Sequence, residues 1–188
     1  SGKHVVVDLD LAKFFDEVNH QHLMWMLGTR IGDKALPSLI GKILKTDIQQ
    51  DGLQTQRIKG TPQGSPLSPL LSNIILDELD RELMRRGLDF VCYADDFRIF
   101  AGSIKSAERI YESIIRFIEE RMLLKVNRDK SGIKKCTEVT YLGYGFLPEG
   151  TLSLSDKSEE RLKRKLKETT CAVTGGGISF EQILKELE

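Results

Sequence analysis

Two short strand-like runs with acidic residues between them limit how this chain can fold. Val91-Cys92-Tyr93 and residues 98–101 are rich in the β-branched and aromatic side chains that strands favour. They are separated by Ala94-Asp95-Asp96-Phe97, a segment short enough to reverse the chain. The sequence therefore predicts a β-hairpin that carries Asp95 and Asp96 at its apex.

A further strand is predicted near the start of the chain, where Val5-Val6-Val7 leads into Asp8-Leu9-Asp10. If this strand lies beside the hairpin, Asp10 meets the two apical acids. Carboxylates that converge from separate elements are what two-metal phosphoryl or nucleotidyl transfer requires, with the ions about 3.5–4 Å apart. Each motif alone is weak evidence, because an Asp-Asp pair in a turn is most often solvated and an Asp that ends a strand most often caps a helix.

The spacing of apolar residues predicts the other elements. These are helices over 23–27 and 36–44, a hairpin within 46–59 around Asp51-Gly52, a helix from Ser65-Pro66 or Ser68-Pro69 to Leu83, a helix over 107–122, a strand over 124–127 and a pair of strands across 140–154. This order is typical of an α+β domain with an antiparallel β-sheet and helices packed on one face. From Asp156 the composition becomes that of a charged helix, so we predict a domain over 1–155 and a C-terminal helical stub over 156–188.

Charge gives no overall indication of a partner, because 28 basic and 28 acidic residues cancel. This balance excludes the strongly basic composition of many nucleic-acid-binding domains, so any such surface must be local. Between residues 121 and 135 six basic residues accompany one acid, Asp129. That surplus would suit a phosphate backbone, although an exposed charged face explains it nearly as well.

Cysteines, histidines and apolar runs provide mainly exclusions. Cys92, Cys136 and Cys171 are far apart, which indicates neither a zinc site nor a disulfide framework. His20 and His22 are two positions apart and do not share a helical face, so we assign no metal to them. No apolar run approaches the roughly 20 residues that span a bilayer. We expect a cytoplasmic protein with no membrane partner.

Three ordered motifs resemble those of reverse transcriptases. Tyr93-Ala94-Asp95-Asp96 is similar to the Tyr-x-Asp-Asp box, Asp10-Leu11-Ala12-Lys13-Phe14-Phe15-Asp16 to the first acidic box, and residues 61–69 to the Pro-Gln-Gly box. Downstream matches are Asn127, Lys130 and Ser131, and then Tyr141-Leu142-Gly143-Tyr144. From residue 4 to about 147 the chain resembles the palm of bacterial group II intron-encoded reverse transcriptases and maturases. Residues 157–188 resemble, less specifically, the start of the thumb or maturase region.

The resemblance implies an RNA-directed DNA polymerase that uses Mg²⁺, for which Mn²⁺ can substitute. It implies Asp10, Asp95 and the Leu11 carbonyl as metal ligands, with Asp96 supporting the metal site and the primer terminus, and Lys130 as a candidate general acid. Substrate-binding positions are Phe15, a steric gate at the sugar 2′ position, together with Gln63, Gly64, Tyr93 and Ala94. The partners would be an RNA template, a DNA primer, deoxynucleoside triphosphates and the intron RNA, in a bacterial cytoplasm.

Two details of the sequence bear on these assignments. Asp8 is an alternative to Asp10, but we expect it on the opposite face of the strand, and the pair Phe14-Phe15 fits the motif only if Asp10 is its acid. Arg98 departs from the family, in which this strand position is commonly apolar, and we expect it to face the primer groove.

Other readings remain open. Retron, diversity-generating and CRISPR-associated reverse transcriptases belong to the same enzyme class, and the run that follows Gln63, Gly-Ser-Pro-Leu-Ser-Pro, favours the intron type while CRISPR-associated relatives share it. A splicing maturase that uses the fold as an RNA-binding scaffold is the alternative from another class. The chain opens on what looks like a central strand, so we expect a fragment without upstream fingers that polymerises poorly alone.

Overall fold

The structure, a computed structural model, describes residues 2–46, 48–50, 53–55, 57–62, 64–147 and 151–174, with the backbone alone at 48–50, 53–55 and 170–174. The chain forms two compact units, Ser1–Lys134 and Lys135–Glu188. The division falls earlier than residue 155, where the change in composition placed it, because the strands that precede the charged helix associate with that helix. Whether the C-terminal part is a thumb stays a prediction.

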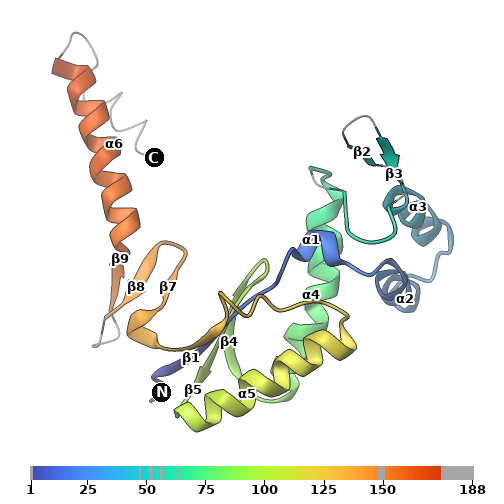
Figure 1. Cartoon of the computed structure of the whole chain (residues 1–188), viewed down its shortest axis with the longest axis horizontal. Helices are drawn as coiled ribbons and strands as arrows, with labels where there is room; N and C mark the ends of the chain where they lie inside the picture. The colour runs from blue at the N-terminus through green and yellow to red at the C-terminus, as the bar shows by residue number, and fades with distance from the viewer. Residues whose placement is uncertain are drawn as a thin grey trace. The chain divides into compact units, whose positions relative to one another are not determined.

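The first unit contains a four-stranded sheet, a two-stranded hairpin and five α-helices among its described residues (Figure 1). In chain order these elements are β1 (Val5–Asp10), α1 (Phe14–Glu17), α2 (His20–Arg30), α3 (Ala35–Leu44), β2 (Ile48–Gln50), β3 (Leu53–Thr55), α4 (Leu67–Arg85), β4 (Asp89–Tyr93), β5 (Asp96–Ala101), α5 (Ile104–Arg116) with a π-helical continuation (Phe117–Arg121), and β6 (Gly132–Lys135).

The main sheet has the strand order β4-β5-β1-β6, so the first strand of the chain lies in its interior. β5 pairs antiparallel with both β1 and β4. The register gives the sheet two different faces, because side chains alternate along a strand. Val7 opposite Ile99 and Leu9 opposite Phe97 belong to one face, whereas the acidic positions belong to the other.

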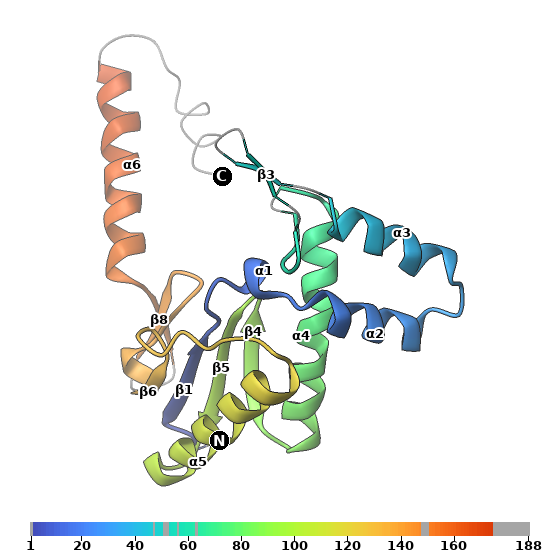
Figure 2. The ribbon, with the colours of Figure 1, turned by 45° about the vertical axis from the view of Figure 1, so that its right-hand side comes forward.

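Helices α4 and α5 cover the apolar face of this sheet (Figure 2). A single core contains the sheet side chains and the helical stripes that were visible in the sequence, among them Leu71, Ile75, Leu79 and Leu83 of α4 and Ala107 and Ile114 of α5. Burial of these apolar stripes is the main stabilising term for such a layered unit. The predicted α+β architecture, with helices on one face of an antiparallel sheet, is confirmed.

Several element boundaries differ from the sequence prediction. The strand expected over 124–127 is reduced to one bridge, Leu11 to Val126, and the strand beside β1 is β6, which the sequence did not indicate. The helix α4 begins after Ser65-Pro66, so the alternative start at Ser68-Pro69 is wrong. β2 and β3 pair as the predicted hairpin, and its turn at residues 51–52 lies outside the described residues.

The second unit has a three-stranded antiparallel sheet followed by a long helix. Its elements are a 3-10 turn (Cys136–Glu138), β7 (Thr140–Tyr141), β8 (Tyr144–Phe146), β9 (Leu152–Leu154) and α6 (Asp156–Thr174), so the expected pair of strands is a set of three. Leu142 and Gly143 form the β7–β8 turn with positive φ at both positions, as tight hairpins require. In the part of the chain that the structure describes, no helix has the length and apolarity needed to cross a membrane.

Candidate metal-dependent active site

The end of β1 and the tip of the β4–β5 hairpin lie at one end of the main sheet. Asp10 is opposite Asp96 in the β1–β5 ladder, and Tyr93 is opposite Asp96 in the β4–β5 ladder. Asp95 occupies the turn beside Ala94, whose φ of 53° is in the left-handed region. Strand pairing therefore brings together two acidic segments that are far apart in sequence.

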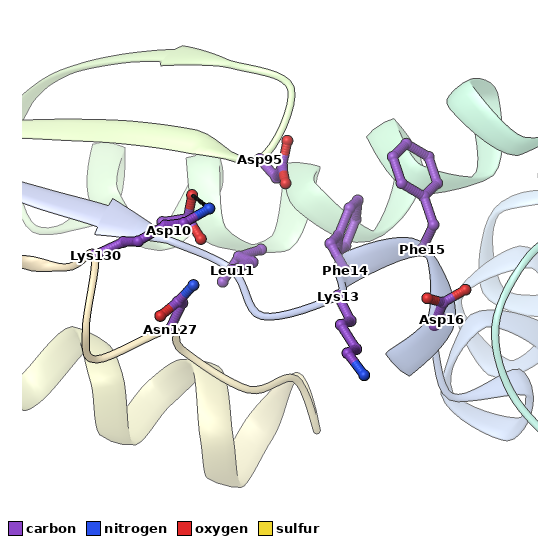
Figure 3. Close-up of a pocket in the computed structure, with 9 residues that line it drawn as sticks. All are labelled: Asp10, Leu11, Lys13, Phe14, Phe15, Asp16, Asp95, Asn127 and Lys130. Carbon is purple, nitrogen blue, oxygen red and sulfur yellow. Dashed lines mark ion pairs between the residues drawn. The ribbon is translucent and has the colours of Figure 1, made fainter. Parts of the chain in front are cut away.

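Asp10 and Asp95 line one pocket of about 370 Å³. Figure 3 shows Asp10 at the end of its strand and Asp95 on the hairpin, with Leu11 beside them. The other described residues that line it are Leu11, Lys13, Phe14, Phe15, Asp16, Asn127 and Lys130. Of the predicted site positions, Asp96, Gly64, Tyr93 and Ala94 are described but are not among these lining residues, and Gln63 lies outside the described residues.

The turn from Asn127 to Ser131 fixes the backbone of Asp10. The sequence analysis had matched Asn127, Lys130 and Ser131 of this turn to a motif. Asn127 donates its backbone N–H to the Asp10 carbonyl at 2.8 Å, and its own carbonyl accepts from Ser131 at 2.9 Å. The Ser131 hydroxyl accepts from the Asp10 N–H at 2.9 Å. Both backbone groups of Asp10 are thereby satisfied, which holds its side chain at the pocket.

Lys130, from the same turn, approaches the acid. Its Nζ lies 3.9 Å from Oδ2 of Asp10, and its side chain is 69% exposed. An exposed lysine at the limit of ion-pair distance is weakly held. The structure thus places Lys130 at the pocket, while its role as a general acid stays a prediction.

Asp96 points to different partners from those of Asp10. Arg98 Nη1 lies 3.2 Å from Asp96 Oδ1, and Arg98 Nε lies 3.3 Å from Asp8 Oδ1. The expectation that Asp8 faces away from Asp10 is wrong: positions 8 and 10 are two apart, so both side chains belong to the same face of β1. Asp8 is instead separated from the site by its ion pairs, including one from Lys134 Nζ at 2.7 Å.

Residues 59–61, which we call the anchor segment, lead into the Pro-Gln-Gly motif. They are attached to helix α1 and to the residues that follow α1. Gly60 donates to Val18 at 2.8 Å and Thr61 donates to Phe15 at 2.7 Å, both through backbone groups. His20 Nε2 is 2.6 Å from the Gly60 carbonyl, and since a carbonyl only accepts, this nitrogen carries the proton. His20 is therefore a structural residue of this anchor segment, and no local pattern in the sequence indicated that role.

Glu17 joins three segments around the pocket. Its carboxylate pairs with Lys59 at 2.8 Å and with Lys125 at 3.4 Å. The hydrogen bond from Lys59, together with the positive charges of both lysines, lowers the pKa of Glu17 despite its partial burial. The ionised carboxylate thus holds the anchor segment and the strand-like segment around Lys125 against α1.

The two aromatic residues of the first acidic motif, Phe14 and Phe15, differ in burial, although both line the pocket. Phe14 is buried and Phe15 is half-buried, and their ring centroids are 5.4 Å apart. Both contribute to the pocket lining, together with Lys13 and Asp16, which the sequence analysis did not single out. Lys13 has a φ of 48°, and this left-handed turn directs the chain from the strand into α1. Phe15 is placed where it could contact a bound substrate, and its gating role stays a prediction.

The donor set fits a hard divalent cation that keeps part of its water shell. Among the described residues no cluster of three or more His, Cys, Asp or Glu side chains is arranged to hold a metal. Asp10, Leu11 and Asp95 nevertheless line the pocket together, and carboxylate and carbonyl oxygens are the ligands that a hard divalent cation takes when substrate phosphates and waters complete its coordination. A closed protein cage would suit Zn²⁺ or Ca²⁺ better.

Comparison with known proteins identifies the family. The family model for reverse transcriptase (RNA-dependent DNA polymerase) matches residues 1–146. Protein YkfC of Escherichia coli is 30% identical over 76% of this chain and 45% of its own length. Group II intron-encoded protein LtrA of Lactococcus lactis is 35% identical over 47% of this chain and 15% of its length. Retron Mx65 reverse transcriptase of Myxococcus xanthus is 28% identical over 88% and 41%, respectively.

Solved structures share the fold. Apo telomerase from Candida tropicalis, truncated from its C-terminal domain, superposes with a TM-score of 0.63 at 12% identity, covering 80% of this chain and 35% of that one. The main sheet with its helices is thus a polymerase palm. The chain spans less than half the length of these relatives.

Proposed function

Because the chain belongs to the reverse transcriptase family, we propose that it carries the catalytic centre of an RNA-directed DNA polymerase. The observation that supports this most directly is the pocket that Asp10 and Asp95 line at the meeting point of β1 and the hairpin. Two carboxylates beside an open pocket are suited to nucleotidyl transfer, because its transition state needs little from the protein beyond positioning and charge stabilisation.

In the proposed mechanism Asp10, Asp95 and the Leu11 carbonyl would hold Mg²⁺. The chemistry supplied by such a bound cation would be activation of the primer 3′ hydroxyl and neutralisation of the triphosphate charge. The chain itself orients these ligands, since the Asn127–Ser131 turn fixes the Asp10 backbone and the β4–β5 ladder fixes the hairpin tip. Lys130 stands near enough to Asp10 to contribute positive charge to a leaving pyrophosphate.

Substrate contacts are proposed from the family motifs and, for Phe15 and Tyr93, from their places in the structure. We assign Phe15, at the pocket, to the sugar of the incoming nucleotide, and Gln63 and Gly64 to the template and nascent pair. Tyr93 is 62% exposed near the tip, which leaves its ring accessible to a primer terminus. A deoxynucleoside triphosphate, an RNA template and a DNA primer are the substrates that this arrangement would serve.

Within the family, the proposal is a group II intron-encoded protein with the intron RNA as a further partner. Similarity to LtrA supports it, and so does the Ser-Pro-Leu-Ser-Pro run, which forms the start of α4: the Leu67 N–H donates to the Ser65 hydroxyl at 3.3 Å. The retron enzyme is the second candidate, since its similarity extends over more of the chain. We place the protein in the reducing cytoplasm of a bacterium, where the free thiol of Cys92 is stable.

Single-nucleotide addition to a DNA primer on an RNA template, in Mg²⁺ or Mn²⁺, tests the proposal. We expect slow addition by the 188-residue chain and a loss of roughly a hundredfold or more in D10N and D95N, because even outer-shell partners of a metal are worth about 10–100-fold. Asp89→Asn is the matched control: this exposed acid lies at the other end of β4 and pairs with Lys3. Addition that survives both substitutions would contradict the proposal.

A further inference from the structure

A row of alternating charges crosses the second face of the main sheet behind the hairpin tip. It runs from Asp96 to Arg98 on β5, then to Asp8 on β1 and to Lys134 on β6. The N···O separations are 3.2, 3.3 and 2.7 Å in that order. Two carboxylates therefore meet two cations, and the row is neutral as a whole.

Burial is greatest in the middle of this row. The side chains of Asp8 and Arg98 are each 11% exposed, whereas that of Asp96 is 48% exposed. A charge removed from water is costly unless it is paired, and deleting one partner of a buried pair is strongly destabilising. Arg98 and Asp8 thus stabilise each other by charge, and Nη1 of the guanidinium lies beside Asp96; both contacts are ion pairs rather than hydrogen bonds.

The two acids at the hairpin tip, Asp95 and Asp96, have different surroundings. Asp95 lines the pocket with Asp10, but Asp96, although opposite Asp10 in the ladder, is not among the described lining residues and lies against Arg98. We propose that Arg98 is a positioning residue, anchored by Asp8, that holds the Asp96 carboxylate out of the metal-binding pocket. The inference rests on the proposed function, because it concerns the same metal site.

This arrangement limits the negative charge that the site offers to a cation. With Asp96 held aside, Asp10 and Asp95 are the two carboxylates at the meeting point of β1 and the hairpin, while Asp16 joins the lining from α1, and further ligand positions stay available for water and phosphate oxygens. If Arg98 is removed, Asp96 is free to rotate toward the pocket and to become a third carboxylate ligand. The expected result is tighter metal binding at a site built to bind loosely.

Mn²⁺ titration of the whole 188-residue chain, followed by electron paramagnetic resonance without nucleotide, measures this effect. We expect Arg98→Met to tighten Mn²⁺ binding by about tenfold, the scale on which partners of metal ligands change affinity. Arg98→Lys keeps a positive charge on this face but not the two separately placed nitrogens, so its gain in affinity should be smaller than that of R98M. In the double variant D96N/R98M the gain should vanish, because no third carboxylate is available.

Each outcome decides between defined alternatives. Unchanged or weaker Mn²⁺ binding by R98M overturns the inference, as does an equal gain in the D96N background, which would mean that Arg98 acts only through its charge. The metal site itself is tested in the same series: D10N and D95N must weaken Mn²⁺ binding, and if they do not, the proposed function fails rather than the role of Arg98.

The same set of variants includes a check that each protein folds. Removing Arg98 alone leaves the buried Asp8 paired with Lys134, so thermal unfolding is recorded for every variant. If R98M does not fold, D8N/R98M replaces it, because Asp96 and Lys134 then still balance in charge. The same gain in Mn²⁺ affinity is expected of that variant, and its absence would equally overturn the inference.

Discussion

Substitution of Gly60 tests how the anchor segment is attached beside the pocket. Gly60 has a φ of 84°, and a Cβ there would lie 2.9 Å from the Asp16 carbonyl oxygen and 3.0 Å from Asp16 Cα and from the Phe15 carbonyl oxygen. These are backbone atoms of α1, so they cannot rotate out of the way. The segment must move and weaken the hydrogen bonds from Gly60 to Val18, from Thr61 to Phe15 and from His20.

The size of the effect follows from two terms. A left-handed backbone costs an L residue about 1–2 kcal/mol, and each weakened hydrogen bond contributes about 0.5–1.5 kcal/mol. We expect Gly60→Ala to lower the free energy of unfolding by about 2–5 kcal/mol, a large effect for one added methyl group. Gly64→Ala is the matched control, because its φ is 80° but a Cβ meets no described atom within 4 Å; it should cost only about 1–2 kcal/mol.

Urea unfolding followed by tryptophan fluorescence reports on this unit. Trp25 is the only tryptophan of the chain, and it lies on α2, which begins at His20 and so adjoins the anchor. Far-UV circular dichroism should give the same midpoint if the unit unfolds in one step. Equal losses of stability in G60A and G64A, within about 0.5 kcal/mol, would refute the argument that close backbone contact, rather than conformation alone, requires glycine here.

Three further predictions concern the hairpin tip and the segments around the pocket. Ala94 has a φ of 53°, so A94V should lose about 1–2 kcal/mol of stability in urea relative to A94G, because a β-branched residue is strained there; equal stability would show that the tip relaxes freely. Glu17 has a lowered pKa because of its hydrogen bond with Lys59. Its contribution to stability is therefore complete above its ordinary pKa of 4.5 and is lost as the pH falls through the lowered value. In urea unfolding measured against pH, E17Q should reduce the loss of stability in acid, and an unchanged pH dependence would contradict this role of Glu17. Ser131→Ala removes the acceptor of the Asp10 N–H and should cost about 1 kcal/mol in urea unfolding, whereas a neutral effect would mean that water replaces the hydroxyl.

The parts of the site that the sequence could predict are those that local patterns determine. Residues 91–101 form a hairpin because two short strand-like runs enclose a turn, and this places Asp95 at its tip whatever the rest of the chain does. The apolar character of residues 5–7 predicted a buried strand that ends at Asp10, and this strand lies inside the sheet. That it pairs with β5 was a condition of the metal-site hypothesis, and the structure shows this pairing.

The parts that the sequence could not predict depend on register and on distant partners. Asp8 meets both Arg98 and Lys134 only because β5, β1 and β6 are neighbours, and β6 has no strong strand pattern of its own. The predicted orientation of Asp8 was wrong because residues 8 and 10 are two positions apart in β1, and side chains two apart share a face. Gly60 and His20 are forty positions apart, and their hydrogen bond leaves no local signature in the sequence.

Diffraction from crystals of the chain soaked in Mn²⁺, with an anomalous difference map, tests the metal site most directly. We predict a peak in the pocket between the side chains of Asp10 and Asp95, within roughly 2.0–2.6 Å of a carboxylate oxygen, the range of hard cations bound to oxygen. Asp96 should remain beside Arg98 in that map. Manganese bound elsewhere on the chain, with none in contact with Asp10 or Asp95, would contradict the account of this protein as a metal-dependent polymerase.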